Sequence, residues 1–402
     1  NYEAWLLKIG ALTIAKRDEI RARLKDGIEA DLKHAFEEPE PVPVESVEVG
    51  DVYSGEATGH GPRAAGLPEL APSPEPGARS DIRFIDAIQE GLRQSMERHP
   101  ELVLMGQDIA EYGGAFKITD GFVERFGKDR VRNTPLCESA ILGAALGLSI
   151  KGMKAMMEMQ FADFVSEGIT QICNNLAKIH YRWGQNADVV VRMPTGAGVG
   201  AGPFHSQSNE MWFVKTPGLK VVYPSNPYDA KGLLMTAFDD PNPVMFFEHK
   251  AMYRSITGAV PEQPYSIPFG KARVVREGST LSIITYGMGV HWATELADEM
   301  VTANGVKLEI IDLRTLVPLD VETILTSVKK TGKVLLLHED TLTAGFGGEL
   351  AAIIAEHAFE HLDAPIVRVA SWDTPVPFAI PLEQGFLPKG RLKAAVERLA
   401  AY

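Results

Sequence analysis

The sequence predicts an α/β protein built from two doubly wound domains. Short apolar runs such as "DVVVRMP" and "KVLLLHE" recur along the chain and alternate with segments of helical periodicity. Runs without polar alternation indicate strands that are buried on both faces, as in a parallel sheet covered by helices. The chain has 402 residues, of which 45% are apolar, and is therefore long enough for two or three such cores.

A helical tail is predicted over residues 1–53. Large apolar residues recur at every fourth position and would form one stripe along a charged helix: Ile20, Leu24, Ile28, Leu32 and Phe36. Thr13 is the expected N-cap, and Pro39 is expected to end the helix and to begin an extended segment. A helix without a core of its own needs a partner surface. Because the chain begins with Asn1 and lacks an initiator Met, we expect a fragment or a processed product.

A linker is predicted over residues 54–80, where five glycines and five prolines accompany almost no large apolar residue. The first α/β domain is expected over 81–262, with a long helix from about Asp163 to Trp183. Its expected strands include "LVLMG", "AMMEMQF", "DVVVRMP", "LKVVYP" and "PVMFFEH". The second domain is expected over 263–402, with strands "LSIITYG", "KLEIIDL", "KVLLLHE" and "IVRVAS".

The bulk composition argues against several classes of function. The formal net charge of −13 disfavours a role at nucleic acid or a membrane surface, because both favour basic patches. No apolar run approaches the roughly 18 residues of a membrane span, and no signal peptide is recognisable. The two cysteines, Cys137 and Cys173, form neither a disulfide framework nor a metal-binding spacing, which fits a reducing compartment.

Glu138 lies where an extended segment is expected to turn into a helix of small apolar residues. The helix dipole favours a carboxylate in the first turn by about 0.3–1 kcal/mol, which alone could explain this residue. The same helix has small residues at helical spacing: Ala140, Gly143, Ala144 and Gly147. Such a face would let another backbone or a flat ligand approach closely, and an acid at its edge could hydrogen-bond a heterocycle. On this segment alone, the electrostatic explanation is the simpler one.

Two further stretches carry residues that could bind a ligand. In "EMQFADF", Gln160 and Phe164 are four residues apart and would share a face if a helix had begun there; a buried strand end is the alternative. In "PTGAGVGAGPFHSQSNE", a Gly-rich loop delivers His205 past the end of a buried strand, where α/β proteins place functional groups. That loop lacks the Lys-Ser/Thr ending of a phosphate-binding loop. His338 is expected to be structural.

Together these stretches resemble the β subunit of the thiamine-diphosphate-dependent decarboxylase component of 2-oxoacid dehydrogenase complexes, the family of the pyruvate and branched-chain enzymes. The resemblance runs from about Ile82 to the C-terminus and includes "GQDIAEYGGAF", "DRVRNTPLCE", "EMQFADF", "FHSQSNE" and "DDPNPVMFFEHKAMYR". It implies a transketolase-like pyrimidine-binding domain followed by a transketolase C-terminal domain. Residues 1–53 resemble the C-terminal tail of the α subunit, so the chain is similar to the back end of an α–β fusion.

The resemblance also implies which residues contact the cofactor. Glu138 matches the glutamate that hydrogen-bonds the aminopyrimidine ring, and Phe164 matches the aromatic residue that packs on it. Leu136 and Gln160 match other residues of the pocket. His205 matches the histidine that faces the reacting centre and helps acyl transfer to a lipoyl arm. The small-residue helix matches one that packs on its counterpart across a subunit interface.

The family's α subunit holds the diphosphate and Mg²⁺ through a Gly-Asp-Gly motif, which this sequence lacks. The resemblance therefore implies half of each active site in this chain. Its implied partners are an α subunit or segment, a second β chain and a dihydrolipoyl acyltransferase with its lipoyl domain, in the bacterial cytoplasm or the mitochondrial matrix. A monovalent cation such as K⁺, bound by backbone carbonyls, is common in these subunits; the matching positions are Ala187, Val189, Val190, Ala237, Asp240 and Asn242.

Several alternatives stay open at this point. A nicotinamide oxidoreductase would suit parallel sheets, but no Gly-x-Gly-x-x-Gly opens a helix with an acid about 20 residues further on. A single-chain transketolase-type enzyme would need the diphosphate motif in the same chain. A non-catalytic scaffold subunit would not need Glu138 or His205. The substrate is also open: "TPLCE" and "EMQFADF" lean toward the branched-chain type, and pyruvate enzymes share much of this pattern.

Overall fold

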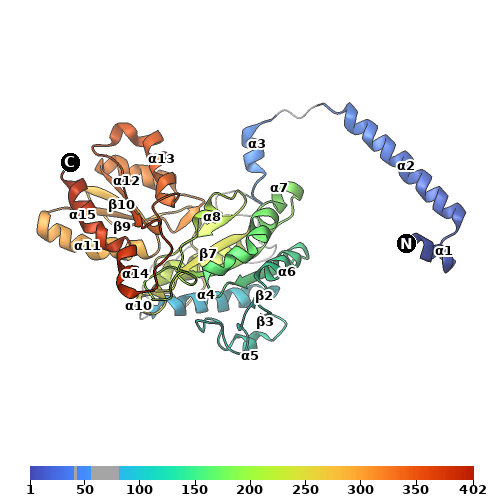
Figure 1. Ribbon diagram of the computed structural model, residues 1–402, viewed down its shortest axis with the longest axis horizontal. Coiled ribbons are helices and arrows are strands. Elements are labelled where there is room, and N and C mark those ends of the chain that lie inside the picture. Colours follow the sequence, from blue (N-terminus) through green and yellow to red (C-terminus); the bar gives the residue numbers. More distant parts are fainter. Residues whose placement is uncertain (40–42, 56–80) are drawn as a thin grey trace. The chain divides into compact units, whose positions relative to one another are not determined.

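The computed structural model describes residues 1–39, 43–55 and 81–402, so residues 56–80 of the predicted linker lie outside the described residues. The chain divides into two units, Asn1–Val49 and Gly50–Tyr402 (Figure 1). Within the described residues, no helix combines the length and apolar character needed to cross a membrane.

The N-terminal unit is helical, as predicted. Its helices are α1 (Tyr2–Lys8), α2 (Ile14–Glu37) and α3 (Glu45–Gly50). Thr13 caps α2 as expected, because its hydroxyl accepts a hydrogen bond from the backbone N–H of Lys16 at 3.2 Å. An extended segment was expected after Pro39. This prediction was wrong for Glu45–Gly50, which form α3. Two acidic residues in the first turn of α3, Glu45 and Glu48, favour a helix there.

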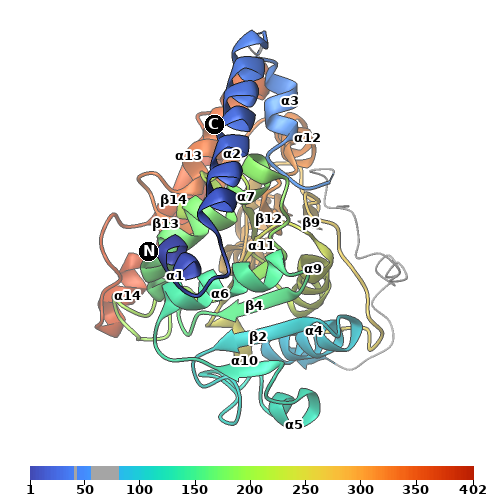
Figure 2. The same ribbon diagram turned by 90° about the vertical axis from the view of Figure 1, so that its right-hand side faces the viewer.

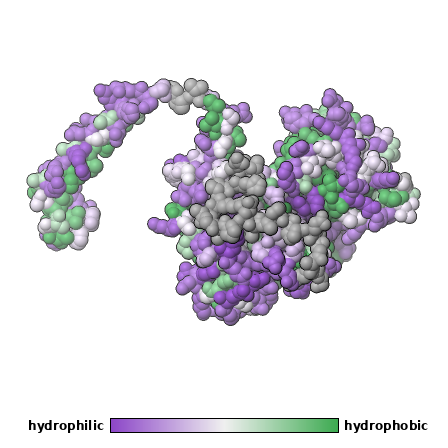
Figure 3. Space-filling view, turned by 180° about the vertical axis from the view of Figure 1, so that it is seen from behind, coloured by the Kyte–Doolittle hydropathy of each residue, from purple (hydrophilic) through white to green (hydrophobic). Residues whose placement is uncertain are grey.

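The apolar stripe of α2 is not covered within this unit. Leu24, Ile28, Leu32 and Phe36 are each at least half exposed, and no residue of α2 is buried. Figure 3 shows apolar residues among polar ones along these helices. The helix is therefore supported mainly by its own backbone hydrogen bonds, its N-cap and surface ion pairs such as Lys16–Glu19.

The first domain of the larger unit contains a seven-stranded sheet of order β12-β6-β7-β5-β4-β2-β3. All neighbouring pairs are parallel except β12–β6. The strands are β2 (Leu102–Gly106), β3 (Val131–Asn133), β4 (Lys154–Glu158), β5 (Val189–Thr195), β6 (Lys220–Val222), β7 (Val244–His249) and β12 (Thr315–Val317). The predicted strands are confirmed, whereas the edge strands β3 and β12 were not predicted.

Helices cover both faces of this sheet, which explains the continuous apolar strands. Successive residues of β2 enter different cores: Leu102 and Leu104 pack with α4 and α9, while Val103 and Met105 pack with α6. Figure 2 shows α4 and α9 close together beside β2 and β4. The helices of this domain are α4 (Phe84–Arg98), α5 (Phe122–Phe126), α6 (Glu138–Ile150), α7 (Ile179–Trp183), α8 (Met211–Val214), α9 (Pro227–Asp239) and α10 (Met252–Ser255).

The long helix expected from Asp163 to Trp183 is not continuous. The segment consists of a 3₁₀ helix, η1 (Ala162–Gly168), a π-helix, η2 (Gln171–Leu176), and α7. Gly168 allows a close approach to α6, since a Cβ there would lie 2.2 Å from Cδ1 of Leu142. The prediction was correct about the helical path and wrong about its regularity. Turns of 3₁₀ and π type within helical segments often mark functional regions.

The second domain contains a five-stranded sheet of order β14-β13-β10-β11-β9, in which only β9 is antiparallel to its neighbour. Its strands are β9 (Arg273–Arg276), β10 (Leu281–Thr285), β11 (Leu308–Asp312), β13 (Val334–Thr341) and β14 (Val367–Ser371). Its helices are α11 (Met288–Asn304), α12 (Val321–Thr331), α13 (Phe346–Ala358), η3 (Phe359–His361), α14 (Ile380–Phe386) and α15 (Lys389–Ala400). A short pair, β1 (Ile82–Arg83) with β8 (Thr257–Gly258), joins the start of the first domain to its end. The predicted fold class is confirmed.

Arg192 on β5 is fully buried and forms ion pairs with the two neighbouring strands. Its Nη1 lies 2.6 Å from Oε2 of Glu158 on β4, and its Nε lies 2.7 Å from Oε1 of Glu248 on β7. The Tyr253 hydroxyl also donates to Glu248 at 2.7 Å. Burial alone would lower the pKa of Arg192, but Glu248 and Glu158 raise it above its ordinary value, so the guanidinium keeps its charge.

Replacing Arg192 with Met is expected to lower the free energy of unfolding by about 3–5 kcal/mol, because two buried carboxylates lose their cation. Urea unfolding followed by circular dichroism measures the change. The matched control is Arg276→Met: Arg276 pairs at 2.7 Å with Asp298, which is 84% exposed, and we expect a loss of about 0–1 kcal/mol. An equal loss of unfolding free energy in the two variants would contradict the importance assigned to the buried ion pairs of Arg192.

Candidate functional site

A groove of about 740 Å³ opens beside the first turn of α6. Its lining residues are Leu136, Cys137, Glu138, Ser139, Ala140, Gly143, Phe164, Glu167 and Gln171. Three of them were predicted from the sequence: Leu136 precedes α6, Glu138 begins it, and Phe164 comes from η1. Because β3 ends at Asn133 and α6 begins five residues later, the groove lies at the carboxyl edge of the parallel strands, the edge where α/β proteins bind ligands.

Glu138 is a nearly buried carboxylate at this groove, with 6% of its surface exposed. Its Oε1 accepts a hydrogen bond from Nε2 of Gln107 at 3.1 Å. Gln107 directly follows β2, so the end of this strand holds the first side chain of α6. Glu138 also lies in the first turn of α6, at the positive end of the helix dipole. Glu138 can therefore accept a hydrogen bond from a ligand N–H in the groove.

Aromatic rings connect the groove to the histidine of the Gly-rich loop. The His205 ring lies edge-on to Phe164, with 5.5 Å between ring centroids and 78° between planes. It lies closer to Phe161, at 4.7 Å and 87°, and the two phenylalanine rings lie 5.8 Å apart. His205 does not line the groove itself but contacts one of its walls. The structure thus brings Glu138, Phe164 and His205 into one region.

Gln160 does not join this groove. It is half-buried and lies between β4 and η1, outside the lining residues. Helical geometry begins only at Ala162. For this reason Gln160 and Phe164 do not share a helical face, and Gln160 lies just past the end of a buried strand, as in the alternative interpretation.

Lys250 is a buried cation beneath the aromatic rings. Its Nζ donates to the carbonyl oxygen of Gly196 at 2.7 Å and lies 5.8 Å from the ring centroid of Phe161. Burial lowers the pKa of Lys250 to about 8, against the opposing effect of nearby carboxylates. Asp163, one of these carboxylates, accepts a hydrogen bond from the backbone N–H of Gln207 at 3.2 Å. Burial raises the pKa of Asp163.

Three residues that contribute to this region were not predicted from the sequence, although they lie inside the motifs quoted above. Gln107 is in "GQDIAEYGGAF", Phe161 in "EMQFADF" and Lys250 in "DDPNPVMFFEHKAMYR". Gln107 and Lys250 each follow a buried strand directly. A polar residue directly after a buried parallel strand is a sequence signal that could have identified both, because the carboxyl ends of parallel strands lie at the ligand-binding edge.

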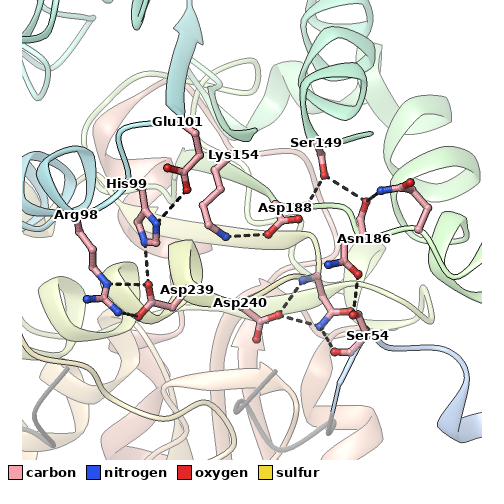
Figure 4. A network of polar contacts seen from close by, with 12 residues as sticks. Ser54, Arg98, His99, Glu101, Ser149, Lys154, Asn186, Asp188, Asp239 and Asp240 are labelled. Atoms are coloured by element: carbon pink, nitrogen blue, oxygen red, sulfur yellow. Dashed lines mark hydrogen bonds and ion pairs between the residues drawn. The ribbon is translucent and has the colours of Figure 1, made fainter. Parts of the chain in front are cut away.

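The positions predicted for a monovalent cation lie at the opposite edge of the same sheet. Ala187, Val189 and Val190 are at the amino end of β5, Ala237 and Asp240 are at the end of α9, and Asn242 precedes β7. Figure 4 shows the polar network at this edge, which includes the pair Lys154–Asp188 at 2.8 Å. Among the residues that the structure describes, no group of three or more His, Cys, Asp or Glu side chains could hold a metal ion.

Asp240 is already balanced by a cation of the protein. Its carboxylate pairs with Nζ of Lys220, and it accepts hydrogen bonds from the backbone N–H and the Nδ2 of Asn242, each at 2.9 Å. Asn242 also exchanges two hydrogen bonds with the backbone of Ser54, at 2.8 and 3.0 Å. A cation bound here would therefore depend on carbonyl oxygens.

Comparisons with known proteins agree with this architecture. Residues 80–255 match the family of transketolase pyrimidine-binding domains, and residues 270–391 match the family of transketolase C-terminal domains. A solved structure described as a split-gene transketolase, an inactive β4 tetramer, superposes with a TM-score of 0.64 over 80% of this chain and 98% of that chain. Since only 22% of residues are identical, this likeness shows the fold alone.

Two curated relatives are much more similar in sequence. The 2-oxoisovalerate dehydrogenase subunit beta of Bacillus subtilis is 46% identical over 327 residues, which cover 80% of this chain and 100% of that protein. The pyruvate dehydrogenase E1 component subunit beta of the same organism is 43% identical over 302 residues, covering 75% and 93%. With this identity along nearly their whole length, the chain belongs to the family of 2-oxoacid dehydrogenase β subunits.

Proposed function

We propose that this chain supplies half of the active site of a thiamine-diphosphate-dependent 2-oxoacid dehydrogenase. The enzyme would oxidatively decarboxylate a branched-chain 2-oxoacid or pyruvate and transfer the acyl group to a lipoyl domain. The observation that carries this proposal is the nearly buried Glu138 carboxylate in a groove walled by Phe164. Thiamine diphosphate bound there would supply the nucleophilic carbon that attacks the keto group and accepts the electrons left by CO₂.

The groove residues fit the pyrimidine half of this cofactor. Glu138 would accept a hydrogen bond from the N–H of a protonated ring nitrogen, with its own orientation fixed by Gln107. Phe164 offers an aromatic face for stacking but no hydroxyl. Leu136 is 80% exposed and is placed to contact whatever closes the groove. We assign the diphosphate and Mg²⁺ to the α partner, because the sequence has no Gly-Asp-Gly motif.

The proposed partners follow from this incomplete site. An α subunit or α segment would complete the groove, and a second β chain would pair with this one in an α₂β₂-like assembly. The exposed small residues of α6, Ala140, Ala144 and Gly147, would allow close packing of another helix. A dihydrolipoyl acyltransferase would present the lipoyl domain. The compartment would be the bacterial cytoplasm or the mitochondrial matrix.

We also propose that residues 1–53 form the C-terminal tail of an α segment. Both domain families match from residue 80 onward, so this tail lies outside them. The exposed apolar stripe of α2 supports a role in packing against another surface.

Changing Glu138 to Gln is expected to reduce 2-oxoacid turnover by at least about 100-fold, because the amide no longer accepts the ligand hydrogen bond as an anion. The assay is decarboxylation by the enzyme assembled with its α partner, with thermal unfolding to show that the fold is kept. Glu124→Gln, at an exposed position on α5, is the matched control. Wild-type turnover in the Glu138 variant would overturn the assignment and favour a scaffold subunit.

Changing His205 to Ala is expected to impair acyl transfer to the lipoyl domain by about 100-fold, with a smaller effect on decarboxylation. The physical reason is that the imidazole would position or move a proton at the transfer step. The two steps are separated by measuring lipoyl acylation and, independently, decarboxylation with an artificial electron acceptor. His357→Ala, an exposed change on α13, serves as the control. Equal losses in both assays would rule out the specific role in transfer.

A monovalent cation at the carbonyl site near Asp240 is the last element of the proposal. At a K⁺ concentration ten times Kd, binding to the folded state would stabilise it by about 1.4 kcal/mol. We expect the thermal midpoint to be about 2–4 °C higher in KCl than in choline chloride of equal ionic strength, with a smaller shift in NaCl. Identical midpoints in the three salts would contradict the site.

A further inference from the structure

The Gly-rich loop between β5 and His205 has an unusual backbone. Gly196, Gly198, Gly200 and Gly202 all have positive φ, at 90°, 85°, 70° and 71°. Glycine adopts such angles without strain. Alternation of left-handed residues with ordinary ones turns successive N–H groups toward a common point, which creates a concavity that binds anions.

Two carboxylates of the second domain fill this concavity. Glu383 on α14, only 3% exposed, accepts hydrogen bonds from the N–H of Gly198 at 2.9 Å and from the N–H of Gly200 at 3.1 Å. Glu339 on β13, 7% exposed, accepts one from the N–H of Ala197 at 2.6 Å. Buried carboxylates require such partners, so the loop and the two acids stabilise each other.

The same loop is tightly packed at both ends. A Cβ on Gly196 would lie 2.2 Å from Nε2 of His249, and one on Gly202 would lie 2.3 Å from Cδ2 of Phe378. His249 also contacts Glu339, with Nε2 and Oε2 2.6 Å apart. Although burial opposes it, His249 holds the pKa of Glu339 below its usual value, so this acid is ionised at neutral pH. The loop is therefore held in one conformation up to Gly202, three residues before His205.

We infer that Glu383 is a positioning residue for His205: it fixes the loop through Gly198 and Gly200, and the second domain thereby sets where the imidazole meets Phe161 and Phe164. The inference rests on the role proposed for His205. It adds a residue that touches no substrate and lies 178 positions further along the chain than the group it positions. Acyl transfer is sensitive to this placement, because an error of about 1 Å can cost 10²-fold in rate.

The variant Glu383→Gln tests this directly, since it keeps the side-chain volume and removes the charge and one acceptor oxygen. We expect the amides of residues 196–202 to exchange with deuterium roughly tenfold faster. Lipoyl acylation should fall roughly ten- to hundredfold, while decarboxylation with an artificial acceptor should fall less. Glu356→Gln, at an exposed position on α13, is the matched control and should change none of these rates.

If Glu383→Gln fails to fold, a second variant, Gly200→Ala, tests the same contact, because it disturbs the hydrogen bond between the Gly-rich loop and Glu383 from the loop side. Its Cβ would have only van der Waals contact with Ile380, at 3.9 Å, so the strain is confined to the backbone at φ +70°. The same split between acylation and decarboxylation is expected.

Unchanged deuterium exchange, or faster exchange with equal losses in both reactions, would overturn the positioning role. Failure of the wild-type assembly to acylate a lipoyl domain would instead refute the proposed function, and the exchange experiment, which needs no substrate, tells the two failures apart.

Discussion

The ion pairs of Arg192 are the interaction on which the site depends most. The guanidinium links β4, β5 and β7, and each of these strands delivers part of the functional edge. Phe161 and Phe164 follow β4, the loop to His205 follows β5, and Lys250 follows β7. A charge placed at the centre of the sheet costs desolvation, and two carboxylates offset that cost only in a fixed geometry. In the observed register Glu158 lies directly opposite Arg192, and Glu248 lies opposite Pro194, so both ion pairs fit the strand alignment that spaces the groups these strands carry.

The two domains contribute differently to the site. The first provides the groove, the carboxylate and the rings, all from segments that begin at strand ends. The second provides support: Glu339 and Glu383 reach into the Gly-rich loop, and the core beneath α6 continues into residues of β10, β11 and β13. Catalytic geometry in such an arrangement depends on domain packing as well as on the residues that face the ligand.

Much of this could be predicted from the sequence, for identifiable reasons. The central strands were found because doubly buried parallel strands are continuous apolar runs. Glu138, Phe164 and Leu136, which the structure places along one groove, were proposed from motifs in which their neighbours also matched. The broken helix after β4 was not predicted; its close approach to α6 at Gly168 and Leu142 is a tertiary contact that local sequence does not reveal. The contacts of Ala197 with Glu339 and of Gly198 with Glu383 join residues 142 and 185 positions apart, which no local pattern reveals.

The short strand β12 has a consequence for how the chain is made. It belongs by sequence to the second domain, yet it pairs with β6 and completes the edge of the first sheet. During synthesis the backbone of β6 is open on that side until residues 315–317 emerge from the ribosome, about 90 residues later. An open edge invites pairing with other chains. Nascent or truncated chains that end before β12 are thus exposed to aggregation, since the first sheet is complete only after part of the second domain has been made.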